Sequence, residues 1–365
     1  MSKNLKKIVM YIDALAHGGA QRVMVNLAEY FNAIGVEVIL INDFALESSK
    51  AQYQVSPEIK RYYLRKSVTG NLILKNLERI VRLRKVIKNE KPDCVLSFLG
   101  RPNKRMLIAT VGLKTKKIVS VRNDPNREYG NKFYQKLLAQ ILFLLADGCV
   151  FQTNEAKVYF SKHTQRKSIV IYNPIGEEFY LIQRNTNPRN IITIGRLEPQ
   201  KNHCLLISAF SNIAEEFSKE NLLIYGEGSL KGKLQDMIKN LNLEQRVFLK
   251  GDTKQVPKIL EKAKLFVLSS DFEGMPNALM EAMAAGVPSI STDCPCGGPK
   301  EIIEDGEDGI LVQCGSEEQL EVAIRKMLLQ EEKREKIGIK AKEKAQKFRS
   351  EIIYQKWHQY FISIL

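Results

Sequence analysis

The 365-residue sequence lacks the cysteine patterns of disulfide-rich and zinc-binding proteins. Its six cysteines are scattered and no C-x-x-C occurs. The pair Cys294 and Cys296 has no second His or Cys pair at zinc spacing. We therefore expect reduced core or loop cysteines in a cytosolic protein, with a redox or metal role for Cys294 and Cys296 as the alternative.

The sequence also lacks a long apolar run. The most apolar later run, residues 137–151, contains Gln140 and Asp147 and is shorter than the roughly 20 residues that cross a bilayer. The run 8–12 follows two lysines as in a signal peptide, but Asp13 interrupts it, which favours a first buried strand. No transmembrane helix is predicted.

A third absence is the dinucleotide fingerprint G-x-G-x-x-G. The first predicted turn carries Gly18-Gly19 instead, and residues 226–232 read G-x-G-x-x-x-G, one residue off the pattern. This absence argues against an NAD-dependent oxidoreductase.

Positive charge, in contrast, is abundant and unevenly placed. Residues 1–185 hold 31 Lys/Arg and 15 Asp/Glu, whereas residues 186–365 hold 25 and 26, so the N-terminal half carries the whole net charge of +15. Such asymmetry favours an anionic partner: nucleic acid, a membrane leaflet or a diphosphate lipid. The predicted helix 72–91 is basic and amphipathic, which fits either a membrane surface or an ordinary packed helix with a solvated face.

Short apolar runs alternate with helical stretches along the chain, the pattern of βαβ units and parallel sheets. We predict a domain boundary in the polar, Gly- and Pro-containing segment after residue 176, giving domains 1–183 and 184–350. The predicted strands are 7–13, 35–41, 59–64, 92–98, 117–121, 148–152, 168–172, 190–194, 221–225, 247–251, 265–268 and 289–292.

The stretch from Asp271 to Gly286 has the strongest pattern. It follows a buried strand and contains a loop with Gly274 and Pro276, then a helix for which Asn277 is the predicted N-cap. Free backbone N–H groups and the positive end of a helix dipole lie at such a helix N-terminus, so the stretch predicts a phosphate site.

Charged residues frame this predicted phosphate site. Glu273 and Glu281 are eight positions apart, and carboxylates beside a phosphate site suit hydrogen bonds from sugar hydroxyls. Arg196 and Lys201 lie on another strand-to-helix loop, where both can reach one diphosphate. Each residue alone would be ordinary surface charge.

These motifs resemble retaining glycosyltransferases of family 4. The E-x7-E signature matches Glu273 to Glu281, and residues 195–202 match the G-R-L-x-x-x-K-N loop without a gap. The resemblance implies an α/β GT-B fold, two Rossmann-like parallel-sheet domains facing across a cleft, with helix 351–365 packing back on the first domain. It also implies catalysis that needs no metal or other cofactor.

The resemblance assigns roles to individual residues. Arg196 and Lys201 clamp the diphosphate, Glu281 holds the ribose, and Glu273 holds sugar hydroxyls. Arg122 stands where many relatives have a His against the donor sugar. The acceptor-side candidates are His17, Asn123 and Arg127, with Glu128 beside them. The remaining donor-binding candidates are Gly18, Gly19, Gly274, Met275, Pro276 and Asn277.

The implied function is retaining transfer of a hexose or N-acetylhexosamine from a UDP-sugar to a polyprenyl-diphosphate-linked glycan in bacterial polysaccharide assembly. The enzyme would be cytoplasmic, peripheral on the inner face of the membrane through its basic N-terminal domain, and would bind no nucleic acid. A nucleotide-sugar epimerase on the same scaffold and a basic nucleic-acid-binding protein are the alternatives.

Overall fold

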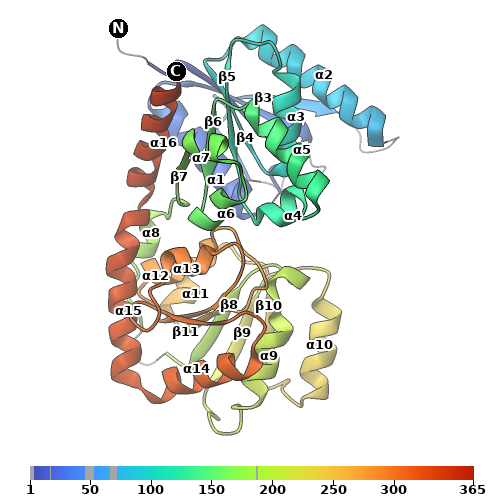
Figure 1. Ribbon diagram of the computed structural model, residues 1–365. Coiled ribbons are helices and arrows are strands. Elements are labelled where there is room, and N and C mark those ends of the chain that lie inside the picture. The colour runs from blue at the N-terminus through green and yellow to red at the C-terminus, as the bar shows by residue number, and fades with distance from the viewer. Residues whose placement is uncertain (1–3, 17, 46–52, 66–71, 186–187) are drawn as a thin grey trace. The chain divides into compact units, whose positions relative to one another are not determined.

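A computed structural model describes residues 4–16, 18–45, 53–65, 72–185 and 188–365. The chain divides into two compact units. Unit 1 comprises residues 1–173 and 351–365, and unit 2 comprises residues 174–350. Each unit is an α/β layer structure built on one parallel sheet (Figure 1).

Unit 1 contains a seven-stranded sheet in the order β3-β2-β1-β4-β5-β6-β7. Its inner strands β1, β2, β4 and β6 are rich in Val, Ile and Leu and almost wholly buried, as expected for parallel strands covered on both faces, whereas the edge strands β3 and β7 are partly exposed. The strands are β1 (Lys7–Ile12), β2 (Glu37–Phe44), β3 (Lys60–Arg65), β4 (Cys94–Phe98), β5 (Lys116–Ser120), β6 (Gly148–Phe151) and β7 (Ser168–Val170). The helices are α1 (Gly19–Ala33), α2 (Leu72–Glu90), α3 (Gly100–Ala109), α4 (Pro125–Tyr129), α5 (Phe133–Leu144), α6 (Asn154–Val158) and α7 (Lys162–Arg166).

The last helix, α16 (Ser350–Ile364), completes unit 1 (red in Figure 1). Trp357 is fully buried and lies 6.0 Å from the Phe98 ring, centroid to centroid. The Tyr360 hydroxyl accepts from the backbone N–H of Cys149 at 2.9 Å and donates to the carbonyl of Lys167 at 2.7 Å. A segment 193 residues from Lys167 and 211 residues from Cys149 in sequence therefore supplies part of this core.

Unit 2 contains a six-stranded parallel sheet in the order β10-β9-β8-β11-β12-β13. The order reverses between β8 and β11, which makes their carboxyl ends the ligand-binding position of such sheets. The strands are β8 (Asn190–Ile194), β9 (Asn221–Tyr225), β10 (Val247–Gly251), β11 (Ala263–Leu268), β12 (Ser289–Asp293) and β13 (Ile310–Gln313). The helices are α8 (Glu177–Tyr180), α9 (His203–Ser211), α10 (Lys231–Asn240), α11 (Val256–Glu261), α12 (Asn277–Ala284), α13 (Gly298–Ile302), α14 (Glu317–Leu329) and α15 (Glu331–Ala345), with 3₁₀ turns at Pro199–Lys201 and Gln346–Phe348.

The division between the units falls ten residues before the predicted boundary at 183/184. Residues 174–183 belong to unit 2 because their contacts lie there. The Tyr180 hydroxyl donates to the carbonyl of Ala345 at 2.8 Å, and helix α8 contacts α12. The polar composition that predicted a linker here belongs to a short packed helix.

Candidate functional site

Three strand-to-helix loops of unit 2 meet at the carboxyl edge of its sheet. They follow β8, β11 and β12, and these three strands are adjacent in the order β8-β11-β12. Each loop leads into a helix, namely α9, α12 or α13. We call their meeting point the carboxyl-edge site, defined by Arg196, Gln200, Lys201, Ser270, Glu273 and Glu281.

The first two loops are joined through Glu273. The Lys201 ammonium forms an ion pair with Glu273 Oε1, and the Ser270 hydroxyl donates to the same oxygen at 2.7 Å. The amide of Gln200 lies 3.4 Å from Glu273 Oε2 and donates to the carbonyl of Phe272 at 2.9 Å. Glu273 is only 6% exposed, so these contacts hold a largely buried carboxylate in one position.

Further bonds fix the same two loops. Asn202 is the N-cap of α9; its side chain accepts from the N–H of Leu205 and donates to Asp271 Oδ1 at 2.8 Å. The Ser269 hydroxyl donates to the carbonyl of Lys201 at 3.0 Å. The Asn202 side chain therefore both caps α9 and links the first loop to the second. Lys201 is held through its ammonium group by Glu273 and through its backbone carbonyl by Ser269.

The third loop packs tightly on the second. Glu273 N–H donates to the carbonyl of Pro295 at 2.7 Å, and Cys296 N–H donates back to the carbonyl of Glu273 at 3.1 Å. A Cβ at Gly298 would lie 1.7 Å from the carbonyl oxygen of Gly274. Only glycine permits this approach of two backbones, so Gly298 sets the position of the Gly274 loop.

Helix α12 begins one residue earlier than the N-cap prediction implies. Pro276, in extended conformation, is the N-cap, and Asn277 is the first helical residue. Proline fixes its own φ near the value found at helix starts, so Asn277 is the first helical residue rather than the cap. The helix ends at Ala284, and Gly286 just beyond it has φ +72°, the left-handed conformation that glycine commonly adopts after a helix C-terminus.

Glu281 lies one turn into α12 and is 3% exposed. It shares the loop–helix segment with Glu273 but is fixed to a helix rather than to the loop. Met275 and Pro276, which lie between Glu273 and Glu281 in sequence, are buried. Arg196, on the first loop, is exposed. Its guanidinium donates to Gln200 Oε1 at 3.4 Å, and of the two predicted cations Arg196 is the more exposed to solvent.

His203 is a residue of this site that the sequence motifs did not single out. Its side chain is 2% exposed, and Nε2 lies 3.3 Å from the carbonyl of Arg196. Burial, with a smaller contribution from Lys201, lowers the pKa of His203 to about 4. His203 is therefore neutral near pH 7 and ties the Arg196 loop to α9. Its place directly after the loop motif was the available signal.

The paired cysteines have the properties of packed residues. Cys294 and Cys296 are buried free thiols, and burial raises the pKa of Cys294 well above its ordinary value. A protonated thiol is a weak nucleophile and a weak metal ligand. Within the described residues, no group of three or more His, Cys, Asp or Glu side chains is placed to hold a metal ion.

The unit 1 candidates gather after β5. Arg122 is buried, its guanidinium lies 4.5 Å from the Phe98 ring centroid, and it donates to Asn173. Its Nε and Nη1 have no hydrogen-bond partner in the described part of the chain, nor does Glu128 Oε2. Burial lowers the pKa of Arg122 to about 9 and raises the pKa of Glu128 to about 8.

The acceptor-side candidates differ in their surroundings. The side chain of Asn123 accepts from the N–H of Asp124 at 2.9 Å, whereas Arg127 is exposed on α4. His17 lies outside the described residues. Gly18 is the N-cap of α1 in extended conformation, with φ −172°, and Gly19 is the first helical residue. Since extended backbone suits any residue, this conformation does not by itself require glycine at position 18.

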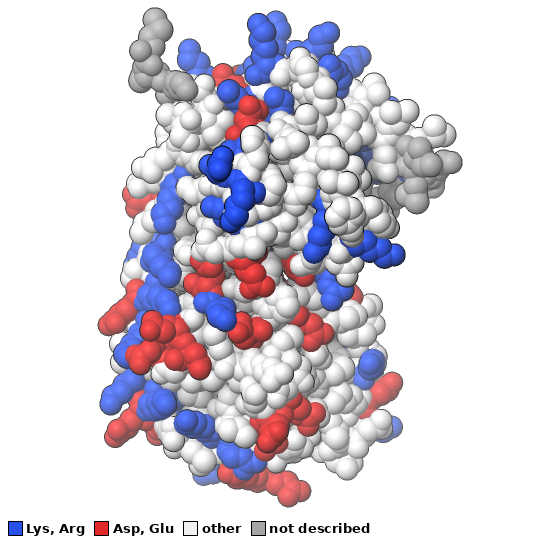
Figure 2. Space-filling view, viewed as in Figure 1, with Lys and Arg blue, Asp and Glu red and all other residues white. Residues whose placement is uncertain are grey.

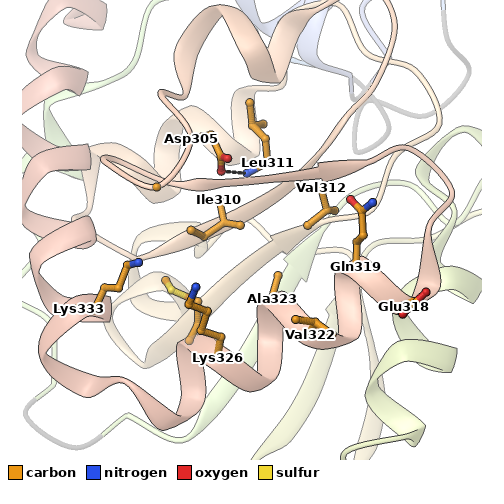
Figure 3. A pocket seen from close by; sticks show the side chains of 12 residues that line it. Asp305, Ile310, Leu311, Val312, Glu318, Gln319, Val322, Ala323, Lys326 and Lys333 are labelled. Atoms are coloured by element: carbon orange, nitrogen blue, oxygen red, sulfur yellow. Dashed lines mark hydrogen bonds between the residues drawn. The ribbon is translucent and has the colours of Figure 1, made fainter.

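A separate cavity of about 480 Å³ lies elsewhere in unit 2 (Figure 3). Residues of β13, α14 and the start of α15 line it, including Ile310, Val312, Val322 and Lys326. The bond from the N–H of Leu311 to Asp305 Oδ1, 2.9 Å long, lies at its edge (Figure 3). None of the predicted site residues lines this cavity, so it is distinct from the carboxyl-edge site.

Two family models match the chain. "Glycosyltransferase Family 4" matches residues 17–179 and "Glycosyl transferases group 1" matches residues 177–344. Their meeting point agrees with the two units of the structure within a few residues. Together they span nearly all of the chain.

Individual relatives agree with these models. The chain is 31% identical to the Campylobacter jejuni N-acetylgalactosamine-N,N'-diacetylbacillosaminyl-diphospho-undecaprenol 4-alpha-N-acetylgalactosaminyltransferase, over 94% of this chain and 96% of that protein. It is 28% identical to a second C. jejuni alpha-1,4-N-acetyl-D-galactosaminyltransferase, over 97% of each.

A solved structure shows the same fold. An Anabaena protein in complex with UDP and glucose superimposes with a TM-score of 0.80 and 18% identity, covering 98% of this chain and 99% of that one. The family models, the relatives and the two parallel-sheet domains agree, and the chain belongs to the family 4 glycosyltransferases of GT-B fold.

Proposed function

We propose that this glycosyltransferase moves a hexose or N-acetylhexosamine from a UDP-sugar to a polyprenyl-diphosphate-linked glycan, with retention of configuration and without a metal. The observation that carries the proposal is the Lys201–Glu273 pair beside the N-terminus of α12. It places a cation, a hydrogen-bond acceptor and free backbone N–H groups at one edge of one sheet. A sugar diphosphate needs all three.

Each group has a role at the reacting bond. As the bond between the anomeric carbon and the diphosphate breaks, negative charge grows on the leaving phosphate. Arg196, Lys201 and the α12 N-terminus stabilise this charge, which lowers the barrier because the stabilisation is strongest in the transition state. The acceptor hydroxyl attacks from the same face, and the leaving phosphate oxygen takes its proton. No protein nucleophile is required.

The carboxylates select the donor. Among the described residues, Glu273 Oε2 has the long 3.4 Å contact to Gln200, so this oxygen can accept a hydrogen bond from a sugar hydroxyl. Glu281, on the helix, would hold the ribose. Unit 1 would carry the acceptor, with Arg122, Asn123 and Arg127 at the end of β5 as the acceptor-side and sugar contacts. Its positive charge matches a diphosphate lipid and an anionic membrane surface.

The relatives support this choice of substrates. Two C. jejuni relatives transfer N-acetylgalactosamine to diphospho-undecaprenol-linked glycans, and the Anabaena neighbour was solved with UDP. UDP-N-acetylgalactosamine is therefore the first donor to test, followed by UDP-galactose and UDP-glucose.

The described residues include no helix long and apolar enough to cross a bilayer. We propose a cytoplasmic enzyme, peripheral on the inner face of the membrane.

Thermal denaturation with UDP, GDP and NAD at equal concentration tests the proposal on wild type and Arg196→Ala. UDP at about 100 times its dissociation constant should stabilise wild type by roughly 2.7 kcal/mol, and the variant by less. Stabilisation by NAD alone would contradict the proposal. If UDP stabilises, transfer to a synthetic polyprenyl-diphosphate glycan is assayed with the three UDP-sugars, and the anomeric configuration of the product is read by NMR.

A further inference from the structure

Helix α5 presents an apolar face to solvent. Only Ala139 and Phe143 of this helix are buried. We call the exposed side the α5 apolar face; it comprises Phe133, Tyr134, Leu137, Leu138, Ile141, Leu144 and Leu145, which are 82, 62, 48, 54, 53, 52 and 40% exposed. These positions recur at helical spacing, so they form one continuous stripe.

The orientation of α5 is fixed by its buried side. The Phe143 ring stacks on Phe160 with centroids 4.3 Å apart. The Gln140 side chain donates to the carbonyl of Tyr159 at 2.9 Å and accepts from the N–H of Ser161 at 2.6 Å. A rotation of α5 that hid the apolar face would break these contacts and expose Ala139 and Phe143 in its place. The exposure is therefore a property of the packed fold.

The surroundings of the α5 apolar face are positively charged. Residues 94–146 hold ten Lys/Arg and two Asp/Glu, and α5 itself has no acidic residue. Lys132 precedes the helix, and Lys162 and Arg166 are exposed on α7, which contacts α5. In Figure 2 the surface over the position of α5 is uncharged, with Lys and Arg nearby. Apolar side chains rimmed by cations match the interface of an anionic bilayer.

We infer that the α5 apolar face inserts into the headgroup–acyl boundary of an anionic membrane and that the neighbouring cations bind its lipid headgroups. The inference deepens the proposed function, on which its biological purpose rests, since a lipid-linked acceptor lies in such a membrane. A second copy of this chain fits less well. Two-fold pairing of this face would bring Lys132, Lys162 and Arg166 close to the same cations of the other copy.

Helix α2 is the other basic amphipathic candidate, and it differs from α5. Leu74, Leu77 and Val81 of α2 are exposed, but Glu78 lies among them and forms an ion pair with Arg82. Arg79 of α2 is buried beside Asp43, 3.5 Å from its carboxylate, and so is withdrawn from any surface. The α5 apolar face is larger and has no acidic residue, so α5 is the inserting helix.

Co-sedimentation with vesicles tests the inference. The full chain is mixed with phosphatidylcholine vesicles and with vesicles that also contain phosphatidylglycerol. Wild type should bind the anionic vesicles, and the triple variant F133S/L137S/I141S should need at least about tenfold more lipid for half-binding. The matched control, L181S/L329S/I339S, removes three exposed apolar side chains from unit 2 and should bind like wild type. The α2 variant L74S/L77S/V81S should retain most of the binding.

Each other outcome overturns the inference. Equal loss in the control would mean non-specific adsorption, and loss in the α2 variant alone would assign insertion to α2. If light scattering shows a wild-type dimer that becomes monomeric in the α5 variant while vesicle binding is unchanged, a second copy covers the face. Thermal stabilisation by UDP is measured in parallel. If wild type binds no vesicles but responds to UDP, insertion is wrong and the transferase proposal stands.

Discussion

The two units share one architecture but place their polar groups differently. In unit 2 the carboxyl-edge side chains bond to one another across loops, as Lys201, Ser270 and Gln200 do around Glu273. In unit 1 the corresponding edge buries Arg122 and Glu128 with atoms that lack hydrogen-bond partners in the described part of the chain. Unit 2 thus joins its loops through contacts among its own side chains, although His203 Nδ1 also lacks a partner among the described residues, whereas unit 1 leaves hydrogen-bonding capacity on both Arg122 and Glu128.

Their surfaces differ in the same way. Unit 1 gathers exposed apolar residues on α5 and α2 within a positively charged surface, whereas the exposed apolar side chains of unit 2, such as Leu181, Leu329 and Ile339, lie on separate elements. Single exposed apolar residues need no explanation, but a continuous face indicates a partner. This difference fits the proposals that unit 2 binds the donor and that unit 1 binds the membrane surface.

The largest effect should separate the two units by stability. Trp357→Ala removes a fully buried side chain from the unit 1 core and should destabilise that unit by about 3–5 kcal/mol. Unit 2 has its own core without Trp357, so its response to UDP should persist. Calorimetry of the variant should show an unfolding transition of unit 1 at a lower temperature than in wild type. A uniform shift of a single transition would mean that the units unfold together and would break the comparison.

The next effect concerns activity in unit 2. Lys201→Ala should lower kcat/KM by about 100- to 1,000-fold, because it removes a charge that stabilises the leaving diphosphate. Lys340→Ala, which removes an exposed lysine from α15 of the same unit, should stay within about twofold of wild type. Steady-state kinetics on both variants provides the measurement. If the Lys201→Ala and Lys340→Ala variants were equally active, Lys201 would have no role in the proposed mechanism.

A pH dependence follows from His203. Its pKa is about 4 in the folded protein, below the ordinary 6.5, so the unfolded chain takes up a proton first as pH falls. The free energy of unfolding should therefore drop by about 3 kcal/mol between pH 6.5 and 4, and be unaffected by this group above pH 7. His203→Asn should lack this component in urea titrations across the same range. Parallel curves for the two proteins would contradict it.

The smallest effect tests loop packing with two glycines of unit 2. Gly298→Ala would push a Cβ against the carbonyl of Gly274 and should destabilise unit 2 by about 1–3 kcal/mol, while weakening UDP binding. Gly232→Ala, inside α10 with open space around it, should stabilise by roughly 0.5–1 kcal/mol. Thermal melts should therefore shift in opposite directions. A harmless Gly298→Ala would mean that the third loop does not position the second.

Much of the fold was predictable from the sequence because hydrophobic periodicity decides where strands and helices form. The predicted strands agree with β1 to β12 within a few residues, and helix 72–91 with α2. Boundaries were less predictable. Helices α14 and α15 follow one another directly and are separated at Gln330, a residue with non-helical dihedrals. Hydrophobic periodicity does not reveal a single non-helical residue, because the apolar positions continue at helical spacing on both sides of it.

The carboxyl-edge site was predictable in composition but not in geometry. The loop motifs identify Arg196, Lys201, Glu273 and Glu281, and the structure brings Lys201 into contact with Glu273. The motifs do not identify Ser270, Gln200 and His203, because the contacts of these residues become apparent only when the neighbouring loop is placed beside them. Arg79 shows the converse. From the sequence, Arg79 belongs to the basic helix 72–91, but in the structure its side chain is buried next to Asp43.

By itself the sequence determined the family and the two parallel-sheet units, and it identified the candidate site residues, because strand–loop–helix patterns are formed by consecutive residues. Tertiary structure alone decided which of these residues touch. Lys201 and Glu273 are 72 positions apart and meet because β8 and β11 are neighbours in the sheet. It also decided that α5, an apolar helix, buries Ala139 and Phe143 and leaves the α5 apolar face exposed. Periodicity reveals an apolar face, but only the packed neighbours determine whether it is covered.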